Sequence, residues 1–220
     1  MASNREDVKE FVSRQIASFT RMSNSSIVKE KLAKLRRGLG KVPGCNPELW
    51  DVTLEELPER FYRKSGEPTK EEWAVYVALT LYALHQQGND IKQNNMNKKD
   101  VSLGTAVRIL DRLRDSGSVE EGSDENAENG QDDNKRRNYR FDRIITAQSI
   151  TELANHLRGM VQLLKQASIP LDYAMLAGDI YGLQFDAECD RVRLRWGQDY
   201  YRRNNKEDAG SETANDNQNN

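Results

Sequence analysis

A strongly acidic stretch, residues 115–134, divides this chain of 220 residues into two parts. The stretch contains eight acidic residues and no basic one, and Val119 and Ala127 are its only apolar residues. Such a segment cannot bury enough apolar surface to offset the entropy lost on ordering, so we expect a disordered linker. Residues 204–220 have the same polar character and are predicted to be a disordered tail. The predicted folded domains are therefore an N-terminal one, residues 1–114, and a C-terminal one, residues 135–203.

The acidic segments conceal a basic character in the rest of the chain. The formal net charge of the whole chain is −2. The linker contributes −8 and the tail −3, so the two predicted domains together carry +9. An excess of basic residues in the folded part is typical of proteins that bind nucleic acid or other acidic partners.

Apolar residues recur at helical spacing in both domains, and no stretch alternates over the length of a strand. Thr69 with Glu72, and Ser149 with Glu152, match the capping box that begins many helices. We therefore predict an all-α fold of two small helical bundles, N-terminal and C-terminal, joined by the disordered acidic linker. The expected helices cover residues 4–20, 26–38, 69–87, 101–114, 140–147, 149–167, 172–182 and 187–203.

The sequence contains no pattern that indicates catalysis, a cofactor or a metal site. His85 and His156 have no third ligand at metal-binding spacing, and the favoured interpretation of both is a place in or beside the core. The alternatives are a contact with a partner or a phosphate. Gly38–Lys41 lacks the phosphate-binding loop pattern. Without a long apolar run or a signal-type N-terminus, we expect a cytoplasmic protein with no membrane segment.

Basic residues repeat along one side of three predicted helices and form two further clusters. Arginine suits phosphate binding because its planar guanidinium donates two parallel hydrogen bonds to two oxygens. The candidate nucleic-acid-binding residues are Arg36, Arg37, Arg108, Arg112, Arg140, Arg143, Arg158, Lys165, Arg191, Arg193 and Arg195. The same side chains would also pair with carboxylates of a neighbouring subunit, or simply form solvated helix faces. A helical protein-interaction scaffold without direct nucleic-acid contact is therefore the alternative function.

Six segments, taken together in their order and spacing, resemble the CasB family, the small subunit of the type I-E CRISPR surveillance complex Cascade. The resemblance covers most of residues 30–203. The segments are LAKLRRGLG (32–40), ALHQQG (83–88), SLGTAVRIL (102–110), RFDRIITA (140–147), LANHLRGMVQLLKQASIPLDYAMLAGDIYGL (153–183) and VRLRWGQDYY (192–201).

The resemblance implies a helical subunit without enzymatic activity, built from an N-terminal and a C-terminal bundle. It also implies that two copies pack head to tail and contact the large subunit and the backbone-forming subunits. The basic surface would help to hold the heteroduplex of CRISPR RNA and target DNA, together with the displaced non-target strand. In such complexes base pairing reads the sequence, and the protein holds the backbone of the R-loop.

The resemblance also assigns roles to individual residues. Arg36 and Arg37 fall in the family's double-arginine motif, and Arg158 falls on a basic position of the long C-terminal helix. Arg140 lies in a basic stretch, and Arg191, Arg193 and Arg195 lie in the basic region of the last helix. Two departures from the family pattern stand out. Thr146 occupies a position that is usually arginine, and the acidic insertion after Arg114 is unusually long. That insertion would either project away from nucleic acid, which is the favoured interpretation, or act as a regulated mimic of nucleic acid.

Overall fold

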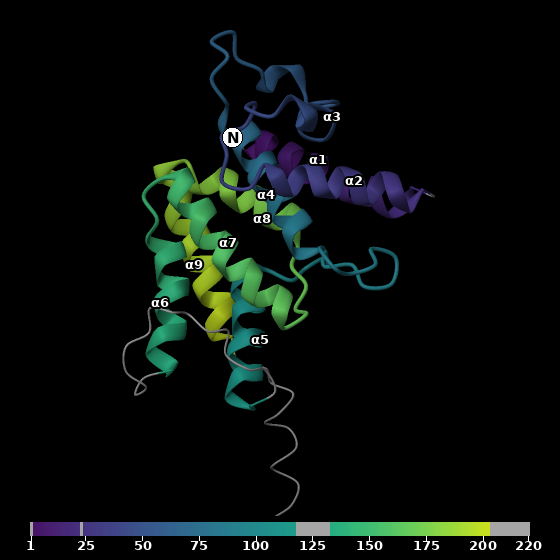
Figure 1. Ribbon diagram of the computed structural model, residues 1–220. Coiled ribbons are helices and arrows are strands. Elements are labelled where there is room, and N and C mark those ends of the chain that lie inside the picture. The colour runs from purple at the N-terminus through teal and green to yellow at the C-terminus, as the bar shows by residue number, and fades with distance from the viewer. Residues whose placement is uncertain (1, 23, 118–132, 203–220) are drawn as a thin grey trace, which may run out of the picture.

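The computed structural model describes residues 2–22, 24–117 and 133–202. In these ranges the chain forms nine α-helices, two short 3-10 helices and no strand, which confirms the predicted all-α fold (Figure 1). The predicted tail lies outside the described residues. So does most of the predicted linker, although Asp115 ends α5 and Asp133 begins α6. The α-helices are α1 (Ala2–Arg21), α2 (Ser25–Arg37), α3 (Trp50–Thr53), α4 (Lys70–His85), α5 (Leu103–Asp115), α6 (Asp133–Thr146), α7 (Ile150–Gln166), α8 (Tyr173–Leu183) and α9 (Asp186–Tyr201).

Helix α4 is the centre of the fold. Every residue from Ala74 to His85 is buried. A helix that is apolar on all sides must be surrounded by other elements, and α1, α2, α7 and α8 all pack against it. The helix begins as predicted, because the Thr69 hydroxyl accepts from the Glu72 amide at 3.1 Å and the Glu72 carboxylate accepts from the Thr69 amide at 2.7 Å.

Helices from before and after the acidic stretch bury one another's apolar faces. In the described chain α1 packs on α8, α4 packs on α7 and α8, and α5 packs on α9. Trp196 of α9 is fully buried. The rings of Tyr82 and Tyr173 pack edge to face, with 5.3 Å between their centres. The N-terminal and C-terminal groups of helices therefore share one continuous core. The predicted domain boundaries at residues 114 and 135 stay a prediction.

The segment between α2 and α4 contains more helix than the sequence pattern indicates. The 3-10 helices η1 (Pro47–Leu49) and η2 (Glu59–Phe61) flank α3 in a region where the sequence predicts no helix. Leu49, Val52 and Phe61 are buried, so contacts with the rest of the core hold these short turns in place. Among the described helices none has both the length and the apolar composition needed to cross a bilayer.

Candidate nucleic-acid interface

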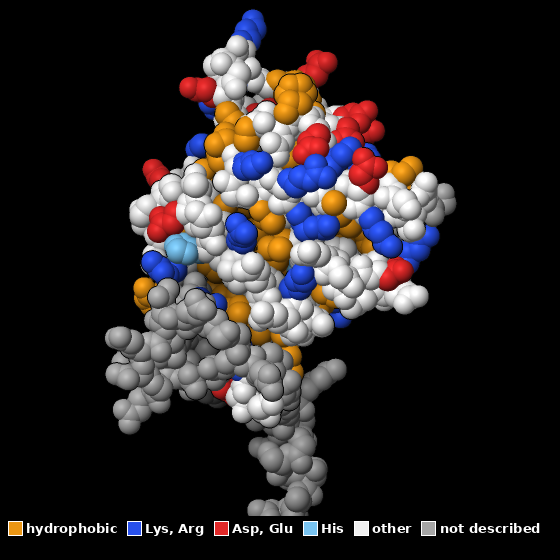
Figure 2. Space-filling model, viewed as in Figure 1, with side chains coloured by type: hydrophobic (Ala, Val, Ile, Leu, Met, Phe, Trp, Pro, Cys, Tyr) orange, Lys and Arg blue, Asp and Glu red, His pale blue; other side chains and the backbone are white. Residues whose placement is uncertain are grey.

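Basic side chains from two helices and one loop gather on the face of the molecule that Figure 2 shows. We define the α2–α7 surface by five residues of α2, of the loop after it and of α7: Arg36, Arg37, Lys41, Arg158 and Lys165. Arg36 lies close enough to Lys165 for its charge to lower the Lys165 pKa, after the larger effect of burial. Lys41 and Arg158 line the same crevice. The structure thus brings together four of the predicted residues and adds Lys41.

Local contacts fix the position of two of these cations. The last turn of α2 carries Arg36, whose Nη1 donates to the carbonyl oxygen of Ala83 at 3.4 Å. Burial lowers the pKa of Arg36, but a guanidinium stays charged at any physiological pH. On α7, the Lys165 Nζ donates to Gln87 Oε1 at 3.1 Å. Both side chains are half-buried, so their charges are partly dehydrated before any ligand arrives.

The α2–α7 surface holds more positive charge than its carboxylates neutralise. Arg37 pairs with Glu48 at 3.1 Å, and both side chains are exposed. In contrast, the other four basic residues of the surface have no carboxylate within ion-pair distance in the described part of the chain. These four unpaired cations are Arg36, Lys41, Arg158 and Lys165. An unpaired cation in a partly dehydrated position favours an incoming anion.

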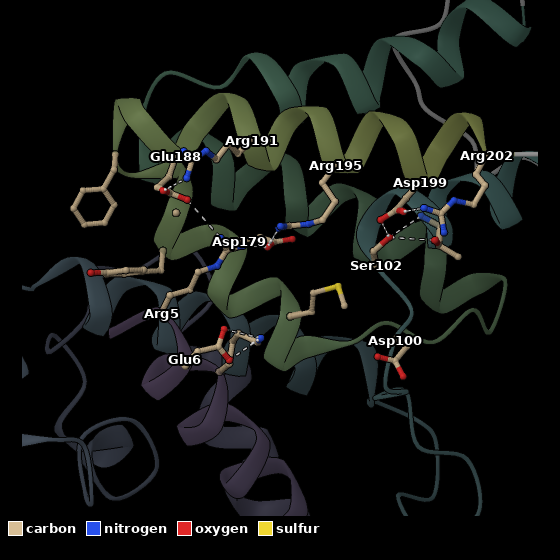
Figure 3. Close-up of a pocket in the computed structure, with 16 residues that line it drawn as sticks. Arg5, Glu6, Asp100, Ser102, Asp179, Glu188, Arg191, Arg195, Asp199 and Arg202 are labelled. Atoms are coloured by element: carbon tan, nitrogen blue, oxygen red, sulfur yellow. Dashed lines mark hydrogen bonds and ion pairs between the residues drawn. The ribbon is translucent and has the colours of Figure 1, made fainter. Parts of the chain in front are cut away.

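The arginines of α9 lie in a different environment. Arg191 and Arg195 line a cavity of about 600 Å³ between α1, α8, α9 and the start of α5 (Figure 3). Arg195 donates to the buried carboxylate of Asp179, and Arg191 pairs with Glu188 at 2.9 Å. Arg193 does not line the cavity and contacts Asp190 at 3.7 Å. All three arginines therefore have carboxylate partners within the chain.

Asp179 organises this cavity. Its carboxylate accepts from Arg5 Nη2 and from Trp196 Nε1, each at 2.7 Å, in addition to Arg195. Burial raises the pKa of Asp179, and the charges of Arg195 and Arg5 act in the opposite direction. Sequence reasoning missed this residue. The available signal was a single acid in the otherwise uncharged apolar segment 173–183, which indicates a buried partner.

The remaining predicted residues lie on α5 and α6. Arg108 donates to the carbonyl oxygen of Arg202, and burial, followed by the charges of Arg112 and Arg202, lowers the Arg108 pKa. Arg112 is exposed, Arg140 is half-buried, and the Arg143 guanidinium lies 5.2 Å from the centre of the Tyr139 ring. The eleven predicted residues therefore fall into groups on different elements. Whether each one contacts nucleic acid stays a prediction.

The two histidines lie where the core interpretation places them. His85 is fully buried, and its Nδ1 lies 2.9 Å from the hydroxyl of Tyr173. Burial lowers the pKa of His85 to about 4, so the imidazole is neutral at physiological pH. His156 lies at the edge of the core, with its Nε2 3.5 Å from a carboxylate oxygen of Glu152.

The fold and these sites define an all-helical protein whose basic residues are displayed on helix surfaces. The family model described as CRISPR-associated protein Cse2 matches residues 31–201. The chain therefore belongs to the Cse2 family, which confirms the resemblance found in the sequence. Membership implies a subunit of a Cascade-type CRISPR complex, in a family of structural subunits that is not known as catalytic.

Solved structures agree with this assignment. The crystal structure of CasB from Thermobifida fusca is similar with a TM-score of 0.65 and 28% sequence identity, covering 89% of this chain and 98% of that one. A CRISPR-associated protein of the Cse2 family from Thermus thermophilus shares the fold with a TM-score of 0.59. Its identity is 21%, and the match covers 88% of this chain and 97% of that chain. No curated protein matches the sequence.

Proposed function

We propose that this chain is the non-catalytic small subunit of a Cascade-type complex and holds nucleic-acid backbone on its α2–α7 surface. In this role it stabilises the heteroduplex of CRISPR RNA and target DNA, together with the displaced strand, during antiviral defence. One observation supports the proposal above others. Three separate segments place the four unpaired cations on one face, with no described carboxylate at ion-pair distance.

Phosphate binding explains why these side chains are arranged as they are. Phosphates that contact lysine or arginine release their condensed counterions, and this release supplies much of the free energy of binding. Arg158 and Lys165 are separated by two turns of α7, about 10 Å along its axis, so together they can follow a strand. Contacts of this kind position a strand without reading its sequence. That division of labour suits a guide-directed complex.

A protein-contact role for a different face has its own support. The α9 arginines already have carboxylate partners, and α9 also exposes 63% of Leu194 and 74% of Tyr201. These two residues lie seven positions apart and therefore on the same side of the helix. We propose that this side contacts other protein subunits of the complex: the large subunit, the backbone subunits or a second copy of this chain.

The proposed function is tested by replacing Arg158 with Gln in the assembled complex. We expect retention of target DNA to weaken to a similar degree for every target sequence. The log–log dependence of affinity on salt should become shallower by about 0.7–0.9, the contribution of one phosphate. Because the Arg158 side chain is exposed, the melting temperature of the chain should not change.

The matched control is Arg63→Gln, which removes an exposed arginine outside the α2–α7 surface. It should leave both target retention and the salt dependence unchanged. Equal losses in the two variants would indicate a general charge effect and would count against the proposed surface. A loss of thermal stability that parallels the loss of binding would make Arg158 a structural residue instead.

A further inference from the structure

A small apolar crevice opens on the α2–α7 surface. Its floor is formed by buried residues of α4, among them Val77 and Leu81. One wall is the loop after α2, with Lys41 and Val42, and the other wall is a stripe of α7 that ends at Arg158. Two of the four unpaired cations therefore border an apolar recess.

The crevice is held open by contacts within the chain. Tyr76 of α4 donates its hydroxyl to the carbonyl oxygen of Gly38 at 2.9 Å, which anchors the loop that forms one wall. A side chain at Gly38 would meet that hydroxyl at 2.6 Å, so the close approach requires glycine. Thr80, at the floor, donates to the carbonyl oxygens of Tyr76 and Val77. The hydroxyls of Tyr76 and Thr80 thus already donate within the chain, and the free lining is mainly apolar.

The size of the crevice limits what can enter it. Its volume is about 40 Å³, whereas a cavity that holds one water has about 10–15 Å³ and one that holds benzene has about 150 Å³. A whole nucleobase does not fit, but a methyl group does. An apolar recess of this size is a poor site for water, because water there finds few hydrogen-bond partners. Val42 at the rim is 51% exposed, so the recess is open to a ligand.

We propose that this crevice receives the C5-methyl edge of a thymine from an unpaired DNA strand. The phosphates flanking that thymine would lie on Lys41 and Arg158. This inference rests on the proposed function, because the phosphate contacts bring the base to the recess. Charge selects the occupant: the rim carries two cations without described carboxylate partners, which suits a polyanion that also carries an apolar group.

The geometry favours an unpaired DNA strand over duplex DNA and over RNA. In a duplex the thymine methyl lies in the major groove, which is about 8.5 Å deep, and a recess cannot reach into a groove. A base released from pairing can instead present its edge to the protein surface. Uracil has no C5-methyl group, so an RNA strand lacks the group that fills the crevice.

The test compares two fluorescein-labelled oligonucleotides of equal length, oligothymidylate and oligodeoxyuridylate, by fluorescence anisotropy on the full chain at low salt. The two strands have the same backbone and charge and differ only in the methyl groups. We expect oligothymidylate to bind about fourfold more tightly, which is the factor expected for burying one methyl group.

Two variants fill the crevice without removing a cation. Ala154→Leu adds a larger side chain at a half-buried position in the wall of the crevice. Thr151→Leu adds one at an exposed position of the same wall. Each should remove the thymine preference and leave the affinity for oligodeoxyuridylate unchanged. The matched control, Asn155→Leu, adds the same side chain at an exposed position of α7 outside the crevice and should keep the preference. Circular dichroism melting checks that every variant is folded.

Each outcome separates this inference from the proposed function. Equal affinities for the two strands in the unmodified chain, with a steep salt dependence, would overturn the crevice proposal and leave backbone binding intact. The absence of measurable binding to either strand at low salt would overturn both. If both variants with a filled crevice still prefer thymine, the preference arises elsewhere and the crevice proposal is wrong. Loss of complex assembly in those variants, without any thymine preference in the unmodified chain, would assign the crevice to a protein side chain.

Discussion

The buried His85 makes the stability of the fold depend on pH in a direction that can be worked out. Burial lowers its pKa in the folded chain to about 4, from an ordinary value of 6.5. Between these two values the unfolded chain binds a proton at this histidine and the folded chain does not. The contribution of His85 to the free energy of unfolding is therefore fully present above pH 6.5 and is lost as the pH falls toward 4.

The size of this effect follows from the two pKa values. The difference between 6.5 and about 4 corresponds to about 3 kcal/mol in the free energy of unfolding. Lowering the pH from about 7.5 to about 5 should remove about 2 kcal/mol of this contribution, because His85 of the unfolded chain is almost fully protonated at the lower pH.

Urea unfolding of the unmodified chain and of His85→Gln, at both pH values, isolates this contribution. The glutamine keeps a side chain that can hydrogen-bond to the Tyr173 hydroxyl, but it does not titrate. All other titrating groups are common to the two proteins. The free energy of unfolding should therefore fall by about 2 kcal/mol more in the unmodified chain. An identical pH dependence in the two proteins would refute the reasoning.

Two further experiments test how the helices pack. Gly104→Ala should lower the melting temperature markedly, because its Cβ would lie 2.1 Å from the backbone oxygen of Trp196. The control Gly159→Ala places its Cβ where no atom lies within 4 Å, so it should be neutral or slightly stabilising. Equal effects of the two substitutions would contradict the tight crossing of α5 and α9. Asp179→Ala should lower the free energy of unfolding by about 1–3 kcal/mol, measured by denaturant titration, because it leaves the buried Trp196 Nε1 donor unpaired and removes a carboxylate partner of Arg5 and Arg195. An unchanged free energy of unfolding would show that water replaces the carboxylate.

Local sequence signals were enough to predict most of the helices. The cap at Thr69 and the apolar run after it define α4, and the periodic apolar residues of α7, such as Leu157 and Leu164, are buried as expected. The second capping box is only half formed. Ser149 accepts from the Glu152 amide, but the Glu152 carboxylate accepts from Gln148 rather than from Ser149. The turns η1 and η2 gave no periodic signal because they are too short to show one.

The grouping of the basic residues could not be predicted from helical spacing. Spacing correctly places Arg191 and Arg195 on one side of α9, but only the packing of α9 against α8 turns that side toward the buried Asp179. In the same way, Arg36 and Lys165 are far apart in sequence and come together because α2 and α7 both pack on α4. Periodicity determines which residues share a helix face, and the tertiary contacts determine what that face meets.

The most direct test of the backbone-holding role replaces all four unpaired cations, Arg36, Lys41, Arg158 and Lys165, with glutamine. The affinity of the assembled complex for target DNA is then measured over a range of salt concentrations. Our account predicts that the log–log slope becomes shallower by about 3, at about 0.7–0.9 for each phosphate that is no longer bound. An unchanged slope in a variant that folds and assembles normally would show that the nucleic-acid backbone is held elsewhere.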